Sequence, residues 1–210
     1  MSPTRLRFLS CLLTALLAVP FPAPAFDTPL SDTAVREAYF LGQRRDDTLS
    51  RFFEKYTKHL PPPKSGPAIT TITFLTPFAL IAQFSSRQGV YSAQQAELDH
   101  RNNGESVRVV VQFAYMGAAN SASDGYTYRP NAFWKDFEFR VLDKDRLLKP
   151  VNSSADPIYS CSEEGGCLLT GATLTFDFLP ESFTSDTAVV RVIPPEGDPL
   201  DVQFDLSSLR

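Results

Sequence analysis

The sequence predicts an α+β fold in which an N-terminal pair of helices packs on an antiparallel β-sandwich, with one or two short helices after the first strand. Three observations predict it. Apolar residues recur at helical spacing between residues 31 and 60, whereas from Glu105 onward they alternate with polar residues, as in strands with one buried face. Proline and glycine turn signals separate the alternating runs. The 17 Phe, 7 Tyr and 1 Trp are enough aromatic side chains to fill a core between two sheets.

The first 25 residues contain the three parts of an export signal. Arg5 and Arg7 supply positive charge, residues 8–19 are almost wholly apolar but too short to span a bilayer, and an Ala-Pro-Ala cleavage site occupies 23–25. We therefore expect residues 1–25 to be a signal peptide. The protein is then secreted or periplasmic, and no transmembrane segment remains after cleavage.

Residues 26–60 are expected to form the N-terminal helical segment. Ser31 or Asp32 can cap a first amphipathic helix. A second apolar stripe extends to Leu60, with acidic residues at its start and basic residues, including His59, at its end, which suits a helix dipole. Each stripe needs a surface to cover. That surface is the sandwich of the same chain or, as an alternative, a partner protein.

Residues 61–67 begin with three prolines and are expected to be a stiff connector. Residues 68–210 then form the sandwich domain with its helical insertion. Its first strand is expected at Ile69–Leu75, which is rich in threonine and isoleucine. Residues 76–89 alternate like a strand but begin with Thr-Pro, a helix cap followed by a first-turn proline, so we favour helix there.

A third helical run starts at Ser92 and ends near Gly104. The runs Ala38–Arg44, Lys55–Pro63 and Tyr91–Ala96 are similar to segments of exported bacterial proteins with no assigned function. The resemblance covers about a third of the chain. It implies a bacterial exported protein and implies no activity, substrate or catalytic residue.

Five later segments alternate with period two and predict the strands of the sandwich. Their inward-facing residues run from Val107 to Tyr115, from Phe133 to Val141, from Leu168 to Phe178, from Ala188 to Val192, and from Val202 to Leu206.

Two cysteines, Cys161 and Cys167, remain after signal cleavage. An even pair in an exported protein predicts a disulfide, here closing a short polar loop. Neither histidine is near this pair in the sequence, so a metal site or redox pair is disfavoured.

The stretch 117–131 is rich in small polar residues and contains Tyr126, Tyr128 and Arg129. This composition is typical of recognition loops on sandwiches. On a strand, Trp134 points to the face opposite that of Phe133. We therefore expect Trp134 either to lie beneath the N-terminal helices or to be exposed as a contact residue, and we favour the first. These four residues, Tyr126, Tyr128, Arg129 and Trp134, are the predicted surface for a protein, peptide or glycan of the cell envelope.

The sequence contains no local catalytic motif and no nucleotide-binding loop. Asp143 and Asp145 could offer carboxylates to calcium but are ordinary turn residues. We expect no metal and no cofactor, and the net charge of −4 argues against nucleic acid as a partner. The sequence therefore favours a non-catalytic binding or structural module of the cell envelope. The alternative is an extracytoplasmic hydrolase that uses His59 or His100 as its base.

Overall fold

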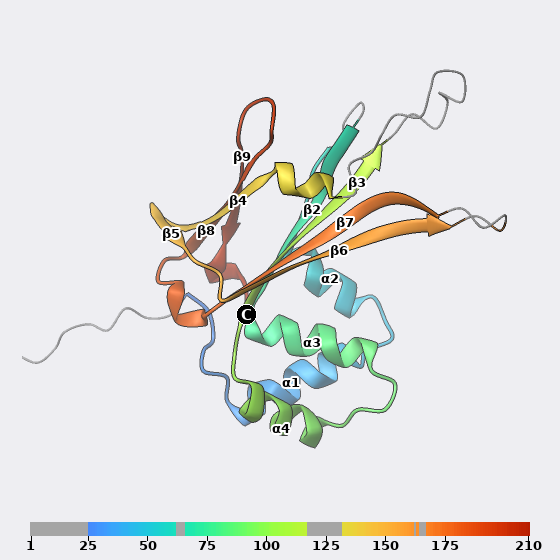
Figure 1. Cartoon of the computed structure of the whole chain (residues 1–210). Helices are drawn as coiled ribbons and strands as arrows, with labels where there is room; N and C mark the ends of the chain where they lie inside the picture. Colours follow the sequence, from blue (N-terminus) through green and yellow to red (C-terminus); the bar gives the residue numbers. More distant parts are fainter. Residues whose placement is uncertain (1–24, 62–65, 117–131, 162, 164–166) are drawn as a thin grey trace, which may run out of the picture.

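The computed structural model describes residues 25–61, 66–116, 132–161, 163 and 167–210. In this part of the chain, four helices gather in a layer below one end of two antiparallel sheets (Figure 1). The expected α+β class is confirmed. The signal peptide, most of the proline-rich connector and the 117–131 loop lie outside the described residues. Within the described ranges, no helix combines the length and the apolar character that crossing a bilayer requires.

Each sheet is antiparallel throughout. The first has the strand order β1-β2-β3-β7-β6, with bounds Thr57–His59, Gly66–Leu75, Val107–Met116, Cys167–Phe178 and Asn152–Cys161. The second has the order β5-β4-β8-β9, with bounds Arg146–Leu148, Glu138–Asp143, Thr187–Ile193 and Leu200–Asp205.

One buried cluster draws its residues from both sheets. The alternation of β3 turns Val107, Val109 and Val111 inward, and β8 presents its own buried valines from the other sheet. Aromatic rings connect the two layers: the Phe74 ring on β2 lies 5.2 Å from that of Phe183 and 5.5 Å from that of Phe204 on β9, measured between centroids. Phenylalanine is abundant because these rings fill the space between the sheets.

The four helices are α1 (Asp32–Gly42), α2 (Thr48–Glu54), α3 (Pro77–Arg87) and α4 (Ala93–Asn103). Hydroxyl caps start three of them, because the side chains of Ser31, Thr76 and Ser92 each accept a backbone N–H of the first turn. Residues 76–89 are therefore mostly helix, as the Thr-Pro signal indicated.

The second N-terminal helix is shorter than expected. It ends at Glu54, and the chain then forms β1, which pairs with β2. Tyr56 is fully buried, and its carbonyl accepts the backbone N–H of Phe74 at 2.9 Å. This long-range pairing overrides the local helical pattern, so the expected position of His59 at a helix end is wrong: His59 lies exposed on an edge strand.

Two irregularities change which side chains face the core in the second half of the chain. Phe133 and Trp134 belong to a 3-10 turn before β4, and do not belong to a strand. In β7, pairing with β6 skips Thr170, so Leu169 is buried and Leu168 is exposed. Phe133 is buried as expected but does not lie on a strand, and the prediction that Leu168 faces inward is wrong. Strict alternation fails where a bulge or turn interrupts the strand.

The helices have a smaller buried cluster of their own, in which α1 packs on α3 and α4. The backbones of α1 and α3 approach most closely at Gly42. A Cβ atom built on Gly42 would overlap the carbonyl oxygen of Ala82 and lie 2.8 Å from the Cβ of Ser85. Glycine is therefore required at this position for the helices to pack at this distance.

Gly42→Ala is expected to lower the free energy of unfolding by about 1–3 kcal/mol, because an added methyl group in a full contact forces the backbones apart. Gly89→Ala is the matched control, since nothing lies within 4 Å of a Cβ added there. Urea unfolding of the two variants measures the difference. Equal stabilities would show that the contact between α1 and α3 can relax without cost.

Candidate functional site

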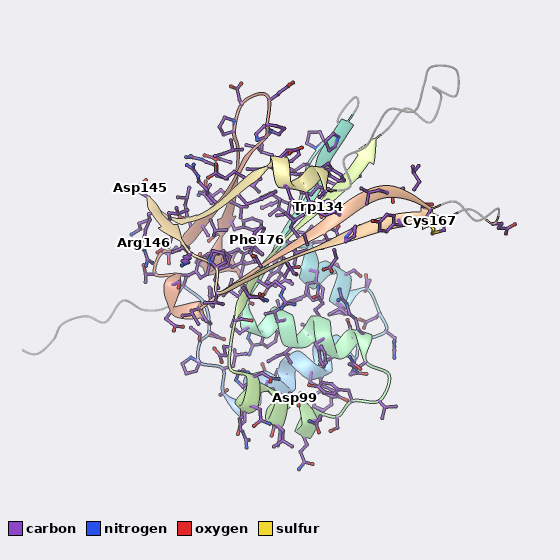
Figure 2. All side chains as sticks on the ribbon, in the orientation of Figure 1. Asp99, Trp134, Asp145, Arg146, Cys167 and Phe176 are labelled. Carbon is purple, nitrogen blue, oxygen red and sulfur yellow. A yellow bond between two sulfur atoms is a disulfide. The ribbon has the colours of Figure 1, made fainter. Side chains whose placement is uncertain are left out.

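A concave pocket of about 190 Å³ lies between α3 and α4; we call it the α3–α4 pocket. One wall is apolar and comes mainly from α3, through Leu80, Ile81 and Phe84. The opposite wall is polar and comes from α4, through Asp99 and His100. Figure 2 shows Asp99 on this helical layer, away from the two sheets.

The turn after α4 closes one end of the pocket. Gly104 has a φ of 70°, in the left-handed region that glycine adopts readily, and its N–H donates to the carbonyl of His100 at 3.0 Å. The chain then reverses into β3. This reversal brings Glu105 and Ser106 to the mouth of the pocket beside His100.

His100 and Glu105 form a largely enclosed pair at this end. The Nε2 atom of His100 lies 3.2 Å from Oε1 of Glu105, and their side chains are only 12% and 11% exposed. The same carboxylate accepts the hydroxyl of Thr28 and the backbone N–H of Leu30, each at 2.5 Å. Glu105 therefore ties the imidazole to the segment of residues 25–31, which we call the N-terminal strap.

Tyr91 and Asp99 form a second pair at the other end. The phenol donates to Oδ2 of Asp99 at 2.9 Å, and the side chain of Gln95 donates to Oδ1 at 2.7 Å. Burial raises the pKa of Tyr91 to about 12, and the neighbouring Asp99 carboxylate acts in the same direction. The phenol thus remains a neutral donor near neutral pH. The Phe84 ring, 48% exposed, lies edge-on to Tyr91 with centroids 5.2 Å apart.

The charge of the pocket limits what it can hold. Two carboxylates line it, from Asp99 and Glu105, and none of its described lining residues is a lysine or arginine. An anion would meet these two carboxylates, whereas a cation would be attracted to them and to the aromatic faces. The pocket therefore suits a small amphipathic ligand that is neutral or positively charged.

A histidine paired with a carboxylate is the arrangement that a general base uses. Among the described residues, however, no nucleophile is positioned against His100. In the described residues, no serine or threonine hydroxyl makes a hydrogen bond to His100, although Ser106 lines the same pocket. Activation of a hydroxyl nucleophile needs such a contact. The other candidate base, His59, lies exposed on β1.

The residues predicted from the sequence as a contact surface are not brought together with this pocket. Tyr126, Tyr128 and Arg129 lie outside the described residues. Trp134 is 8% exposed and its ring lies edge-on to that of Phe133, in the cluster between the sheets (Figure 2). It is neither an exposed contact residue nor covered by the helices, because the 3-10 turn rotates it inward.

The predicted pair of cysteines is joined. Cys161 and Cys167 form a disulfide, and they lie opposite each other at the ends of β6 and β7.

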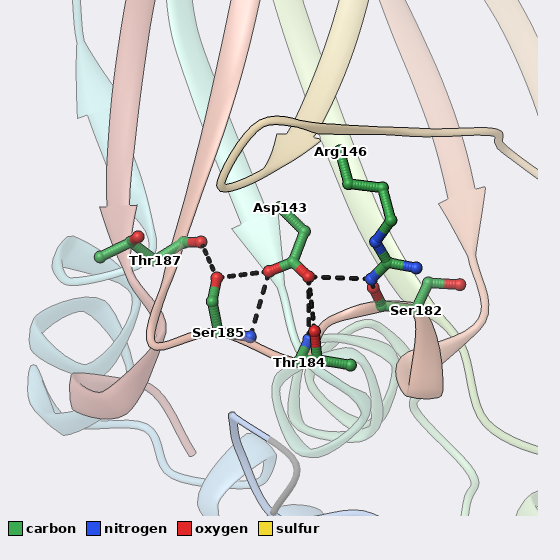
Figure 3. Close-up of polar contacts among 6 residues, drawn as sticks. All are labelled: Asp143, Arg146, Ser182, Thr184, Ser185 and Thr187. Atoms are coloured by element: carbon green, nitrogen blue, oxygen red, sulfur yellow. Dashed lines mark hydrogen bonds and ion pairs between the residues drawn. The ribbon is translucent and has the colours of Figure 1, made fainter. Parts of the chain in front are cut away.

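Asp143 is a second candidate for a functional residue, because it is only 3% exposed and its pKa is strongly shifted. Its carboxylate accepts hydrogen bonds from the backbone and hydroxyl groups of Thr184 and Ser185 and from the guanidinium of Arg146 at 2.8 Å (Figure 3). Burial alone would raise its pKa. The hydrogen bonds from Ser185, Arg146 and Thr184 outweigh burial and lower the pKa to about 2.

These contacts give Asp143 a structural role. Arg146 also donates to the carbonyl of Ser182, so the carboxylate and the guanidinium together hold the β4–β5 turn against the segment before β8. The lone pairs that a calcium ion would need already accept hydrogen bonds. Asp145, the other carboxylate considered for calcium, is exposed in the same turn. Among the described side chains, no three His, Cys, Asp or Glu residues cluster as a metal site.

The chain matches no protein-family model and no curated protein sequence. The chemistry of the α3–α4 pocket is therefore the main indication of its function.

The pocket itself was not predicted from the sequence. His100 and Glu105 flank Gly104, a helix-stop signal, so their proximity could have been inferred from a sharp reversal there. The opposing wall of α3 and the contacts from Thr28 and Leu30 depend on packing between distant segments.

Asp143→Asn is expected to destabilise the protein by about 2–4 kcal/mol at neutral pH. The amide NH2 group of asparagine would face the N–H and O–H donors that now bond to the buried carboxylate. The ionised wild-type carboxylate stabilises the fold fully above about pH 4. This stabilisation, about 2 kcal/mol, is lost as the pH falls toward the folded-state pKa of about 2.

The measurement is urea unfolding of the wild type and the variant between about pH 7 and pH 2, where the difference between them should shrink. Asp145→Asn, in the same turn but exposed, is the control and should leave the pH profile unchanged. A difference that is constant with pH would contradict the assigned role of Asp143.

Proposed function

We propose that this protein is a non-catalytic binding module of the bacterial cell envelope, and that the α3–α4 pocket is its ligand site. Residues 1–25 direct its export. The two facing sheets act as a sandwich scaffold, and the helical layer carries the site. The observation that supports binding most directly is a pocket with an apolar wall, a polar wall and two carboxylates, in which His100 is engaged by Glu105.

Export is supported by the disulfide as well as by the sequence of the leader. Cys161 and Cys167 are joined at an exposed hairpin end, where a reducing compartment would reopen the bond. Structural disulfides persist in oxidising compartments such as the periplasm or the cell exterior.

The proposed mode of recognition divides the ligand between the two walls. An apolar or aromatic part lies along Leu80, Ile81 and Phe84, and an amine or hydroxyl group faces Asp99 and the end of α4. Asp99 is already positioned by Tyr91 and Gln95, so little rotamer entropy is lost when a ligand binds. A pocket of this volume accepts a single ring with a short polar arm.

A hydrolase that uses His100 as its base is the second candidate. The observation that favours it is the largely enclosed imidazole–carboxylate pair in a concave pocket with Ser106 at its mouth. The two functions differ in what Ser106→Ala changes. If Ser106 is the nucleophile of a hydrolase, Ser106→Ala abolishes the turnover of ester substrates. If the protein is a binding module, neither the wild type nor the variant turns over an ester.

Three probes of nearly equal shape test the charge preference: 2-phenylethylamine, 2-phenylethanol and phenylacetate. We expect the amine to bind most tightly and phenylacetate most weakly, because Asp99 and Glu105 repel an anion. Isothermal titration calorimetry with the oxidised protein measures the three affinities. Tighter binding of phenylacetate than of the amine would rule out the proposed recognition.

Phe84→Ala is expected to weaken binding of the amine about threefold to tenfold, through loss of an aromatic face. Asp99→Asn should weaken the amine by a similar factor and leave the alcohol nearly unchanged. Leu98→Ala is the matched control, because Leu98 is 43% exposed on α4 but does not line the pocket. If Phe84→Ala and Asp99→Asn both bind the amine like the wild type, the ligand site lies elsewhere.

A further inference from the structure

β6 is an unusually open edge strand. All ten of its residues are exposed, on both faces. The other three edges of the two sheets are shorter: β1 and β5 have three residues each and β9 has six. Proteins normally keep edge strands short or protect them with lysine, since an open edge can pair with another chain. A ten-residue open edge therefore requires an explanation.

The hairpin of β6 and β7 extends beyond the other strands (Figure 1) and ends at the Cys161–Cys167 disulfide. The disulfide holds the two strand ends together where the second sheet no longer covers them. A partner that binds β6 therefore meets a strand that is already extended, which reduces the entropy cost of binding.

The register of β6 shows which backbone groups are free. Pro157 lies opposite Ala172 and has no N–H, so its nitrogen faces away from β7. In an antiparallel ladder the direction of the backbone groups alternates along the strand. The N–H groups of Ser153 and Ala155 therefore face the open edge, where no strand among the described residues pairs with them.

The side chains of the hairpin indicate the chemistry of the occupant. Ile158, Tyr159 and Leu168 are 42%, 55% and 54% exposed, so apolar contacts are available near the far end. Residues 150–179 contain no lysine or arginine, and Asp156 is exposed near the middle of β6. A basic partner would be attracted to this strand, whereas a second copy would bring the acidic residues of two hairpins together.

We propose that β6 is a docking edge for an extended segment of a partner protein with alternating basic and apolar residues. The segment adds as a further strand beside β6, bonds to the backbone of Ser153 and Ala155, and places its basic side chains near Asp156. This surface is separate from the α3–α4 pocket, and the proposal does not depend on a ligand there.

A fluorescein-labelled ten-residue peptide of alternating lysine and valine is the probe, and fluorescence anisotropy with the oxidised full chain is the measurement. Two control peptides separate the contribution of the edge hydrogen bonds from that of the charge. One carries N-methyl groups on alternate amides, which removes edge hydrogen bonds and keeps the charge. The other has glutamate in place of lysine. We expect both controls to bind at least about tenfold more weakly.

Ala155→Pro is expected to weaken binding of the lysine peptide about fivefold, because it removes a free-edge N–H that the β6–β7 ladder does not use. Asp156→Lys should weaken it by a similar factor, and the loss should shrink at high salt. Ser154→Ala is the matched control, since it changes only a side chain on the same strand. Thermal unfolding confirms that each variant is folded.

Equal binding of the N-methylated and unmodified peptides would overturn strand addition, whatever happens to the Ala155→Pro variant. Binding that neither Ala155→Pro nor Asp156→Lys changes would place the peptide elsewhere on the protein. A dimer in analytical ultracentrifugation that Ala155→Pro dissociates would identify a second copy as the occupant and overturn the proposed basic partner.

Discussion

The antiparallel pairing of β2 with β3 is the constraint on which the site depends. The two strands are adjacent, and their ladder ends with Leu75 opposite Arg108. The residues between them must leave and re-enter the sheet at the same end. They do so as α3 and α4, which start at Pro77 and end at Asn103. Both helices pack on α1, and residues of both line the pocket.

The remainder of the fold holds this insertion in place. Phe74 is on β2, shortly before α3 begins, and its ring is fixed between Phe183 and Phe204. On the other side, α1 covers α3 at the close contact of Gly42. The Asp143 cluster fixes the segment that contains Phe183 by binding the next two residues, Thr184 and Ser185. An acidic side chain far from the pocket thus supports the core on which the helices rest.

The parts of the fold that local chemistry determines could be predicted from the sequence. Thr76 and Pro77 indicated a helix in spite of alternating apolar residues, and α3 starts there. Burial alternates without interruption from Val107 to Phe113 on β3, so the prediction of its inward face is confirmed. The disulfide followed from the count of cysteines and the expected compartment.

The parts that depend on distant partners could not be predicted. β1 exists because its backbone pairs with β2, a contact that no local pattern contains. Trp134 and Leu168 were misplaced because a 3-10 turn and a bulge change which side chains face inward. The pocket depends on how α3 and α4 each pack on α1, so the sequence shows no relation between Phe84 and the carboxylates of Asp99 and Glu105.

The Glu105 carboxylate gives the site a property beyond its shape. One oxygen contacts both His100 and the N–H of Leu30, and the other accepts the hydroxyl of Thr28. A guest that draws Glu105 toward itself must weaken its hold on the N-terminal strap, and a guest that leaves it in place preserves that hold. A ligand of the proposed kind that contacts Glu105 would therefore be coupled to the position of the N-terminal strap.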